Sequence, residues 1–174
     1  MRPARFGRRS ELREALYVMR PLLLLVALSG GVYFFGMAGV FSAPAFLSSE
    51  PEVVSGRFTR CGPGRGHYCV IDGDTFKIGD TSVRVVGIDT AEVEARCPAE
   101  ARQAEASTRA LQRWLNRGRF EMTARLDKPT DRYGRELRTI TRTRPDGSED
   151  ALADYMRSEG GARGYWGEWR DGWC

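Results

Sequence analysis

The pattern of apolar and polar residues divides the chain into one long apolar run and a series of short alternating segments. Residues 21–41 carry no charged side chain, and a helix needs roughly 20 apolar residues to cross a membrane. Six arginines precede this run, whereas no cation follows it before Arg57. The asymmetry predicts a single-pass anchor at 21–41 in the cytoplasmic membrane, with residues 1–20 as a cytoplasmic arm and the remaining chain extracytoplasmic (periplasmic).

A cleaved signal peptide is the alternative interpretation of this run. Ala43-Pro44-Ala45 has the small residues of a cleavage site, and cleavage there would release a secreted protein. Both interpretations place the folded region outside the cytosol. Residues 42–56, rich in Ser, Pro and Glu, are expected to be a linker, and residues 57–174 a single domain.

The domain shows the periodicities of short strands and two helices. Alternation and turn signals predict strands over 70–78, with a bend at Asp72-Gly73-Asp74, and over 82–88, 119–126 and 135–144. An apolar stripe predicts a helix over 98–116, and a shorter helix is expected over 150–159. These elements predict a mainly β, α+β domain compatible with a small barrel.

The net charge of +4 arises in the N-terminal arm. Without the six arginines and two glutamates of residues 1–20, 21 cationic and 21 anionic side chains remain, so the domain is formally neutral. Any binding of nucleic acid must therefore depend on a local cluster of arginines.

The four cysteines, Cys61, Cys69, Cys97 and Cys174, predict two disulfides in an exported chain. Three connectivities are possible. We expect Cys61–Cys69, which closes a short Gly/Pro-rich loop, and Cys97–Cys174, which ties the chain end to the domain.

Three motifs carry candidate chemistry: IDGDT at 71–75, RVVGIDTAE at 84–92 and DRYGR at 131–135. Their carboxylates and arginines suit a phosphodiester-cleaving site around one hard cation. In order and in residues, the motifs resemble those of the staphylococcal nuclease (thermonuclease) family, over residues 69–162. The resemblance implies a five-stranded OB-fold barrel with flanking helices, and a Ca²⁺-dependent endonuclease that hydrolyses DNA and RNA with low sequence specificity.

The resemblance also assigns roles to individual residues. It implies that Asp74, Asp89 and the backbone carbonyl of Thr90 hold one Ca²⁺ ion. Glu92 is the implied general base. Glu94 lies two residues later, and the spacing favours Glu92 for this role. Arg84 and Arg135 would clamp the phosphate, and Tyr133 would contact it. The three catalytic candidates, Arg84, Glu92 and Arg135, are expected at a solvent-facing site outside the core.

Two further residues near these motifs are expected to have no catalytic role. Asp72 is expected to be a turn or structural carboxylate rather than a ligand. His67, the only histidine, lies in the loop between Cys61 and Cys69 and is expected to be structural or exposed. A mechanism built on two histidines is therefore excluded.

Arg84 and Asp89 pose a geometric problem. An odd number of residues separates them, so a flat strand would place them on opposite faces. Both reach one site only if the strand bends, bulges or ends between them, and Gly87 is the natural position.

The chain departs from the family pattern in three respects. Ala91 replaces the usual proline, so the loop before Glu92 is expected to be less rigid. The C-terminal helix of the staphylococcal protein is replaced by an aromatic tail with Tyr165, Trp166, Trp169 and Trp173. The four cysteines are foreign to that protein. A non-catalytic nucleic-acid-binding OB module of the cell envelope is the alternative function.

Overall fold

The computed structural model of the protein describes residues 48–63, 66–167 and 172–174. The predicted arm and the predicted anchor at 21–41 lie outside these residues, as does Trp169. Among the described helices, none combines the length and the apolar character that a membrane span requires.

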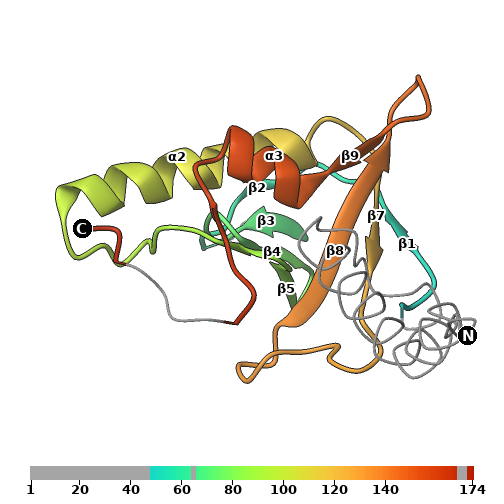
Figure 1. Ribbon diagram of the computed structural model, residues 1–174, viewed down its shortest axis with the longest axis horizontal. Helices are drawn as coiled ribbons and strands as arrows, with labels where there is room; N and C mark the ends of the chain where they lie inside the picture. Colours follow the sequence, from blue (N-terminus) through green and yellow to red (C-terminus); the bar gives the residue numbers. More distant parts are fainter. Residues whose placement is uncertain (1–47, 64–65, 168–171) are drawn as a thin grey trace, which may run out of the picture. The chain divides into compact units, whose positions relative to one another are not determined.

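A curled, mixed sheet forms most of the domain (Figure 1). Its strands run in the order β1-β7-β8-β5-β4-β3-β2, and β9 pairs with β8. Most neighbours are antiparallel, but β5 pairs with β8, and β2 with β3, in parallel. The sheet is a half-barrel, so the expectation of a mainly β, α+β fold is confirmed. The strands are β1 (Glu52–Val54), β2 (Thr59–Arg60), β3 (Tyr68–Val70), β4 (Thr75–Ile78), β5 (Thr81–Val85), β7 (Phe120–Thr123), β8 (Glu136–Thr143) and β9 (Glu149–Ala151).

Two helices, α2 (Pro98–Leu115) and α3 (Leu152–Ser158), lie side by side against the sheet (Figure 1). A second, two-stranded sheet pairs β6 (Ile88–Asp89) with β10 (Arg163–Gly164). The hydroxyl of Ser107 on α2 donates to the carbonyl of Gly160, just after α3, at 2.7 Å. This bond fixes the two helices relative to each other.

Aromatic side chains fill the core between α2 and the sheet. Phe58 packs against Phe76 and Phe120, with ring centroids 5.5 and 6.0 Å apart, and Trp114 of α2 contacts Phe120 at 5.8 Å. All four rings are buried. Because such rings each bury a large apolar area, they anchor the strands that carry the candidate site.

The predicted helix over 98–116 is confirmed almost to the residue. Pro98 occupies its first turn, where a missing N–H costs nothing. At its C-terminal end, the side-chain amide of Asn116 accepts from the N–H of Phe58 at 2.8 Å and donates to the carbonyl of Phe58 at 2.9 Å. The helix end is thus bound to the chain before β2.

The predicted strand over 82–88 is interrupted. It divides into β5 and β6 around Gly87, whose φ of 82° lies in the left-handed region. The expected bend at Gly87 is therefore confirmed, and its effect on the site is described below.

The linker prediction for residues 42–56 is wrong in its C-terminal part. Glu52–Val54 form β1, which pairs with β7, and Ser48 forms a bridge with Arg125. Val54 alone of the three β1 residues is buried. Because β1 is an edge strand with one buried residue, its sequence shows no alternation of apolar and polar residues.

Two further boundaries differ from the sequence prediction. Glu149–Ala151 pair with β8 as β9, so the predicted helix over 150–159 begins only at Leu152. The sheet also holds more strands than the predicted five, because short segments pair along its edges.

Both expected disulfides are present: Cys61–Cys69 and Cys97–Cys174. The first closes the loop that carries His67, which is exposed and packs edge-on against Tyr68 at 4.8 Å. The second joins the residue before α2 to the last residue of the chain.

Candidate functional site

A buried ion pair between Asp74 and Arg84 forms the centre of the candidate site. Thr75 of β4 lies opposite Arg84 of β5 in the antiparallel ladder, which brings Asp74 beside the guanidinium. Nη1 of Arg84 donates to Oδ1 of Asp74 and Nη2 lies close to Oδ2, each at 2.9 Å. Asp74 is 3% exposed and Arg84 is 8% exposed. The pair is therefore bidentate and largely shielded from water.

Arg84 was expected at a solvent-facing position, and this expectation is wrong. Val83 and Val85 point into the core, so Arg84 points to the other face of β5. That face is also covered at this position, because Asp74 and Asp89 close over the guanidinium. An isolated arginine in a strand gives no sign of which face is covered.

Asp89 joins the same cluster from β6. Its Oδ1 lies 3.6 Å from Nη2 of Arg84, and the residue is 6% exposed. The left-handed conformation of Gly87 bends the chain between Arg84 and Asp89. Their side chains therefore point to the same side and meet at one site. Two carboxylates, one just before β4 and one on β6, thus flank a single cationic group.

Gly73 fits closely between Ser107 of α2 and the side chain of Thr90. A Cβ added at Gly73 would lie 2.5 Å from Cβ of Ser107 and 2.8 Å from Oγ1 of Thr90. Real side chains do not approach so closely, so only glycine is accommodated here. The segment before Asp74 is therefore packed tightly between α2 and Thr90, the residue after Asp89.

Asp72 acts as the predicted turn carboxylate. Its Oδ1 accepts the backbone N–H of Asp74 at 3.0 Å, a side-chain turn typical of aspartate.

Burial, with a contribution from the charge of Asp72, raises the pKa of Asp74 to about 7. Arg84 and the hydroxyl of Thr75 act in the opposite direction. A cation beside Asp74 would favour its ionised form.

Arg135 approaches the cluster from the loop before β8. Its Nη1 lies 3.4 Å from Oγ1 of Thr75, and that hydroxyl donates to Oδ1 of Asp74 at 2.7 Å. A chain of hydrogen bonds therefore connects the two predicted arginines through Thr75 and Asp74. Unlike Arg84, the Arg135 side chain keeps 23% of its surface exposed.

Asp131 holds Arg135 in place and was not assigned a role from the sequence. Its Oδ2 accepts from Nε of Arg135 and lies close to Nη2, both at 2.7 Å. Its Oδ1 accepts the backbone N–H groups of Tyr133 and Arg135. Burial alone would raise the pKa of Asp131, but these bonds together lower it. The Asp-x-x-Gly spacing at 131–134 was the signal for this turn.

Tyr133 is exposed over 68% of its surface beside two arginines. Cζ of Arg132 lies 4.8 Å and Cζ of Arg135 lies 5.4 Å from its ring centroid, and Nη2 of Arg132 donates to its hydroxyl at 2.7 Å. An exposed ring flanked by guanidinium groups can meet a phosphate or a base.

Glu92 lies on the loop between β6 and α2, two residues after Thr90, and is exposed, as is Glu94. Ala91 and Thr90, the two residues before Glu92, are both buried. The backbone N–H groups of Arg96 and Glu92 also act on the buried carboxylate of Glu100 and help to lower its pKa. Sequence reasoning missed Glu100, since a glutamate in the first turn of a helix is ordinary.

The aromatic tail lies beside the bend of the site. Trp166 is exposed, and its ring faces Gly87, while the N–H of Tyr165 donates to the carbonyl of Gly87 at 3.1 Å. Arg163 of β10 lies opposite Asp89 in the ladder. The C-terminal segment therefore contributes to the wall of the site.

The structure brings together Asp74, Arg84, Asp89 and, through Thr75, Arg135, with Thr90 adjacent to Asp89. Glu92 and Tyr133 lie on flanking loops. No protein-family model and no curated protein matches the chain.

Proposed function

We propose that this protein is a Ca²⁺-dependent endonuclease of the staphylococcal nuclease type, which hydrolyses phosphodiester bonds of DNA and RNA with low sequence specificity. The observation that supports this most directly is the convergence of two buried aspartates on one arginine. Nη2 of Arg84 lies 2.9 Å from Asp74 and 3.6 Å from Asp89. The curled half-barrel sheet and two helices support the finer proposal of an OB barrel.

The donor groups fit a calcium ion. Asp74 and Asp89 offer carboxylate oxygens, and Thr90 a backbone carbonyl, all in a buried setting. Ca²⁺ prefers such oxygen ligands and completes its shell with water. When bound, the ion would stabilise negative charge on the phosphate and make a nearby water more acidic. Both carboxylates lie next to the guanidinium of Arg84, so the ion would bind beside this group.

The arginines of the chain would stabilise the phosphate during attack. A planar guanidinium can donate to two phosphate oxygens, and negative charge increases on those oxygens in the transition state. Arg135 is suited to this role because it is partly exposed and its fork is held by Asp131. Arg84 would have to release part of its bidentate pair with Asp74 in order to donate to a phosphate.

Glu92 would accept the proton of the attacking water. It is exposed and lies on the segment that follows Asp89 and Thr90, so it can approach a phosphate placed at the cluster. Contacts to phosphate and to a metal carry no information about the bases. Low sequence specificity follows from this.

A cleavage assay of the purified full chain tests this proposal. Supercoiled plasmid, single-stranded DNA and RNA are incubated with Ca²⁺, with Mg²⁺ or with excess chelator. We expect cleavage with Ca²⁺, no cleavage with chelator, and none in the Asp74→Asn variant. Mg²⁺ demands near-ideal octahedral geometry and is expected to support less activity. Full activity in excess chelator would refute the metal requirement.

A non-catalytic nucleic-acid-binding module is the second candidate, and one observation favours it. Asp74 and Arg84 form a bidentate pair that is complete without a ligand. Fluorescence polarisation with labelled DNA separates the two functions: binding without cleavage under every metal condition would support the module.

We also propose that residues 21–41 anchor the protein in the cytoplasmic membrane, with the domain outside. Two disulfides in the domain are consistent with an oxidising compartment. A reporter fused after Cys174 should be active only outside the cytosol. A mature chain that starts near Phe46 would instead support signal cleavage and secretion.

A further inference from the structure

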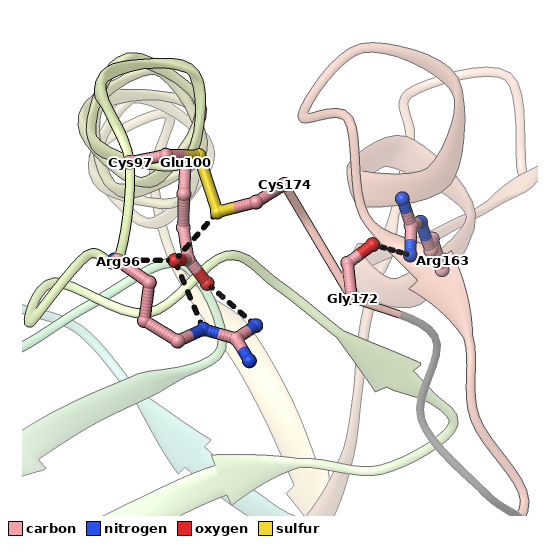
Figure 2. The surroundings of a disulfide bond; sticks show 6 residues. All are labelled: Arg96, Cys97, Glu100, Arg163, Gly172 and Cys174. Atoms are coloured by element: carbon pink, nitrogen blue, oxygen red, sulfur yellow. Dashed lines mark hydrogen bonds and ion pairs between the residues drawn. A yellow bond between two sulfur atoms is a disulfide. The ribbon is translucent and has the colours of Figure 1, made fainter.

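Glu100 is a buried carboxylate that the roles above leave unused. It lies in the first turn of α2 and has 0% exposure. Figure 2 shows that its main partner is Arg96, four residues earlier. Oε2 accepts the backbone N–H of Arg96 at 2.6 Å, and the guanidinium of Arg96 adds contacts of 3.4 and 3.5 Å.

The donors come from the loop rather than from the helix. In an ordinary capping box, a glutamate at this position binds the N–H of the capping residue, and the group stays near solvent. Here the capping residue is Cys97, but Glu100 binds the residue before it. Through the backbone N–H of Arg96, the carboxylate is therefore bonded to the end of the loop that carries Glu92.

The burial of this charge needs an explanation. A buried carboxylate is costly unless charge-assisted hydrogen bonds surround it. A cap for α2 requires no such burial, because an exposed glutamate or aspartate would serve equally well. Complete burial is explained if the loop itself must be held, since buried charge-assisted bonds are stronger and more directional than exposed ones.

The Cys97–Cys174 disulfide covers the carboxylate from the other side (Figure 2). Sγ of Cys174 lies 3.5 Å from Oε2 of Glu100. This sulfur is bonded to Cys97 and has no proton to donate, so the contact excludes water without adding a hydrogen bond. The same tail is bound to β10, since Nη1 of Arg163 donates to the carbonyl of Gly172 at 3.2 Å.

We propose that Glu100 is a positioning residue, which holds the backbone of the loop that carries Glu92 in the place needed for proton transfer. This inference rests on the proposed nuclease function. A general base must lie within hydrogen-bond reach of the water it activates, and a displacement of about 1 Å can lower the rate on the order of 10²-fold. Glu100 acts through Glu92 and contacts no substrate.

The test compares Glu100→Gln with Glu105→Gln. Glutamine retains the size of glutamate, but it turns one acceptor into an N–H donor facing the N–H groups of the loop. Glu105 lies on the same helix, partly exposed beside Arg60 and Arg109, and is the matched control. We expect Glu100→Gln to lower kcat on the order of 10²-fold with KM changed less than about twofold, and Glu105→Gln to change neither.

A double-mutant cycle separates positioning from a general structural role. If Glu100 acts through Glu92, then Glu100→Gln should change kcat less than about twofold in a Glu92→Gln background. Equal losses in both backgrounds would overturn the proposal. So would a wild-type kcat in the folded Glu100→Gln variant.

Hydrogen exchange gives a readout that does not depend on activity. Amides in the peptide covering residues 92–96 should exchange faster in Glu100→Gln, and at the wild-type rate in Glu105→Gln. Unchanged exchange would overturn the claim that Glu100 holds this loop. A wild-type protein that cleaves no substrate would overturn the proposed function and the catalytic part of this inference, while the exchange result still decides whether Glu100 holds the loop.

Discussion

Replacing Arg84 with alanine should destabilise the domain strongly, because Arg84 is the counter-ion of two buried carboxylates. Asp74 and Asp89 lie 2.9 and 3.6 Å from its Nη2, and all three residues are at most 8% exposed. Removing one partner of a buried ion pair typically costs about 3–5 kcal/mol, since the charge left behind stays in a poorly solvated place. We therefore expect a loss of about 3–5 kcal/mol in the free energy of unfolding.

Urea unfolding followed by circular dichroism, with the disulfides intact, measures this loss. At an m value of about 2 kcal/mol per molar urea, the midpoint should fall by roughly 2 M. Arg135→Ala is the control. Arg135 pairs with Asp131 in a more exposed position, where such pairs contribute about 1 kcal/mol or less, so its midpoint should fall by roughly 0.5 M or less.

The loss should depend on pH and on calcium. Burial raises the pKa of Asp74 to about 7, and loss of Arg84 raises it further. A buried carboxyl with a raised pKa destabilises the fold when it must ionise, so the loss should be larger at pH 8 than at pH 5. Added Ca²⁺ should restore part of the stability if it binds the two aspartates. An Arg84→Ala midpoint within about 0.3 M of wild type at pH 8 would refute the reasoning, because the carboxylates would then need no counter-ion.

Three further predictions concern the packing behind the site, the disulfides and catalysis. Gly73→Ala should lower stability and weaken calcium binding, because the added Cβ would lie 2.5 Å from Ser107. Calorimetry measures both effects. Gly66→Ala is the control and should change neither, because the space around Gly66 is open. Replacing Cys97 and Cys174 with serine should cost about 4–5 kcal/mol, against about 2.6 kcal/mol for the Cys61–Cys69 pair, because the sequence separations are 77 and 8. Equal thermal shifts for the two disulfide variants would contradict this. Glu92→Gln and Arg135→Ala should each lower kcat by roughly 10²-fold or more, whereas Glu94→Gln should change it little. A loss of kcat in Glu94→Gln alone would indicate that Glu94, rather than Glu92, is the general base.

Local sequence determined the elements whose signals are short-range. Pro98 and the apolar stripe after it define α2, because helix starts and amphipathic faces depend on neighbouring residues. The conformation of Gly87 was also predictable, since only a bend could bring Arg84 and Asp89 together, and glycine adopts a φ of 82° without strain. The even number of cysteines indicated two disulfides, and the structure contains the expected one of the three possible pairings.

Tertiary structure alone decided which of these residues are buried and what they contact. Arg84 looks like any strand arginine, but it is buried because Asp74, just before β4, and Asp89 of β6 pack against it. Glu100 looks like an ordinary first-turn glutamate, but the loop before it and the chain end 74 residues later enclose its carboxylate. β1 is a strand only because β7 offers an open edge. In each case the deciding contact lies outside the residue's own element, so no local pattern along the chain could reveal it.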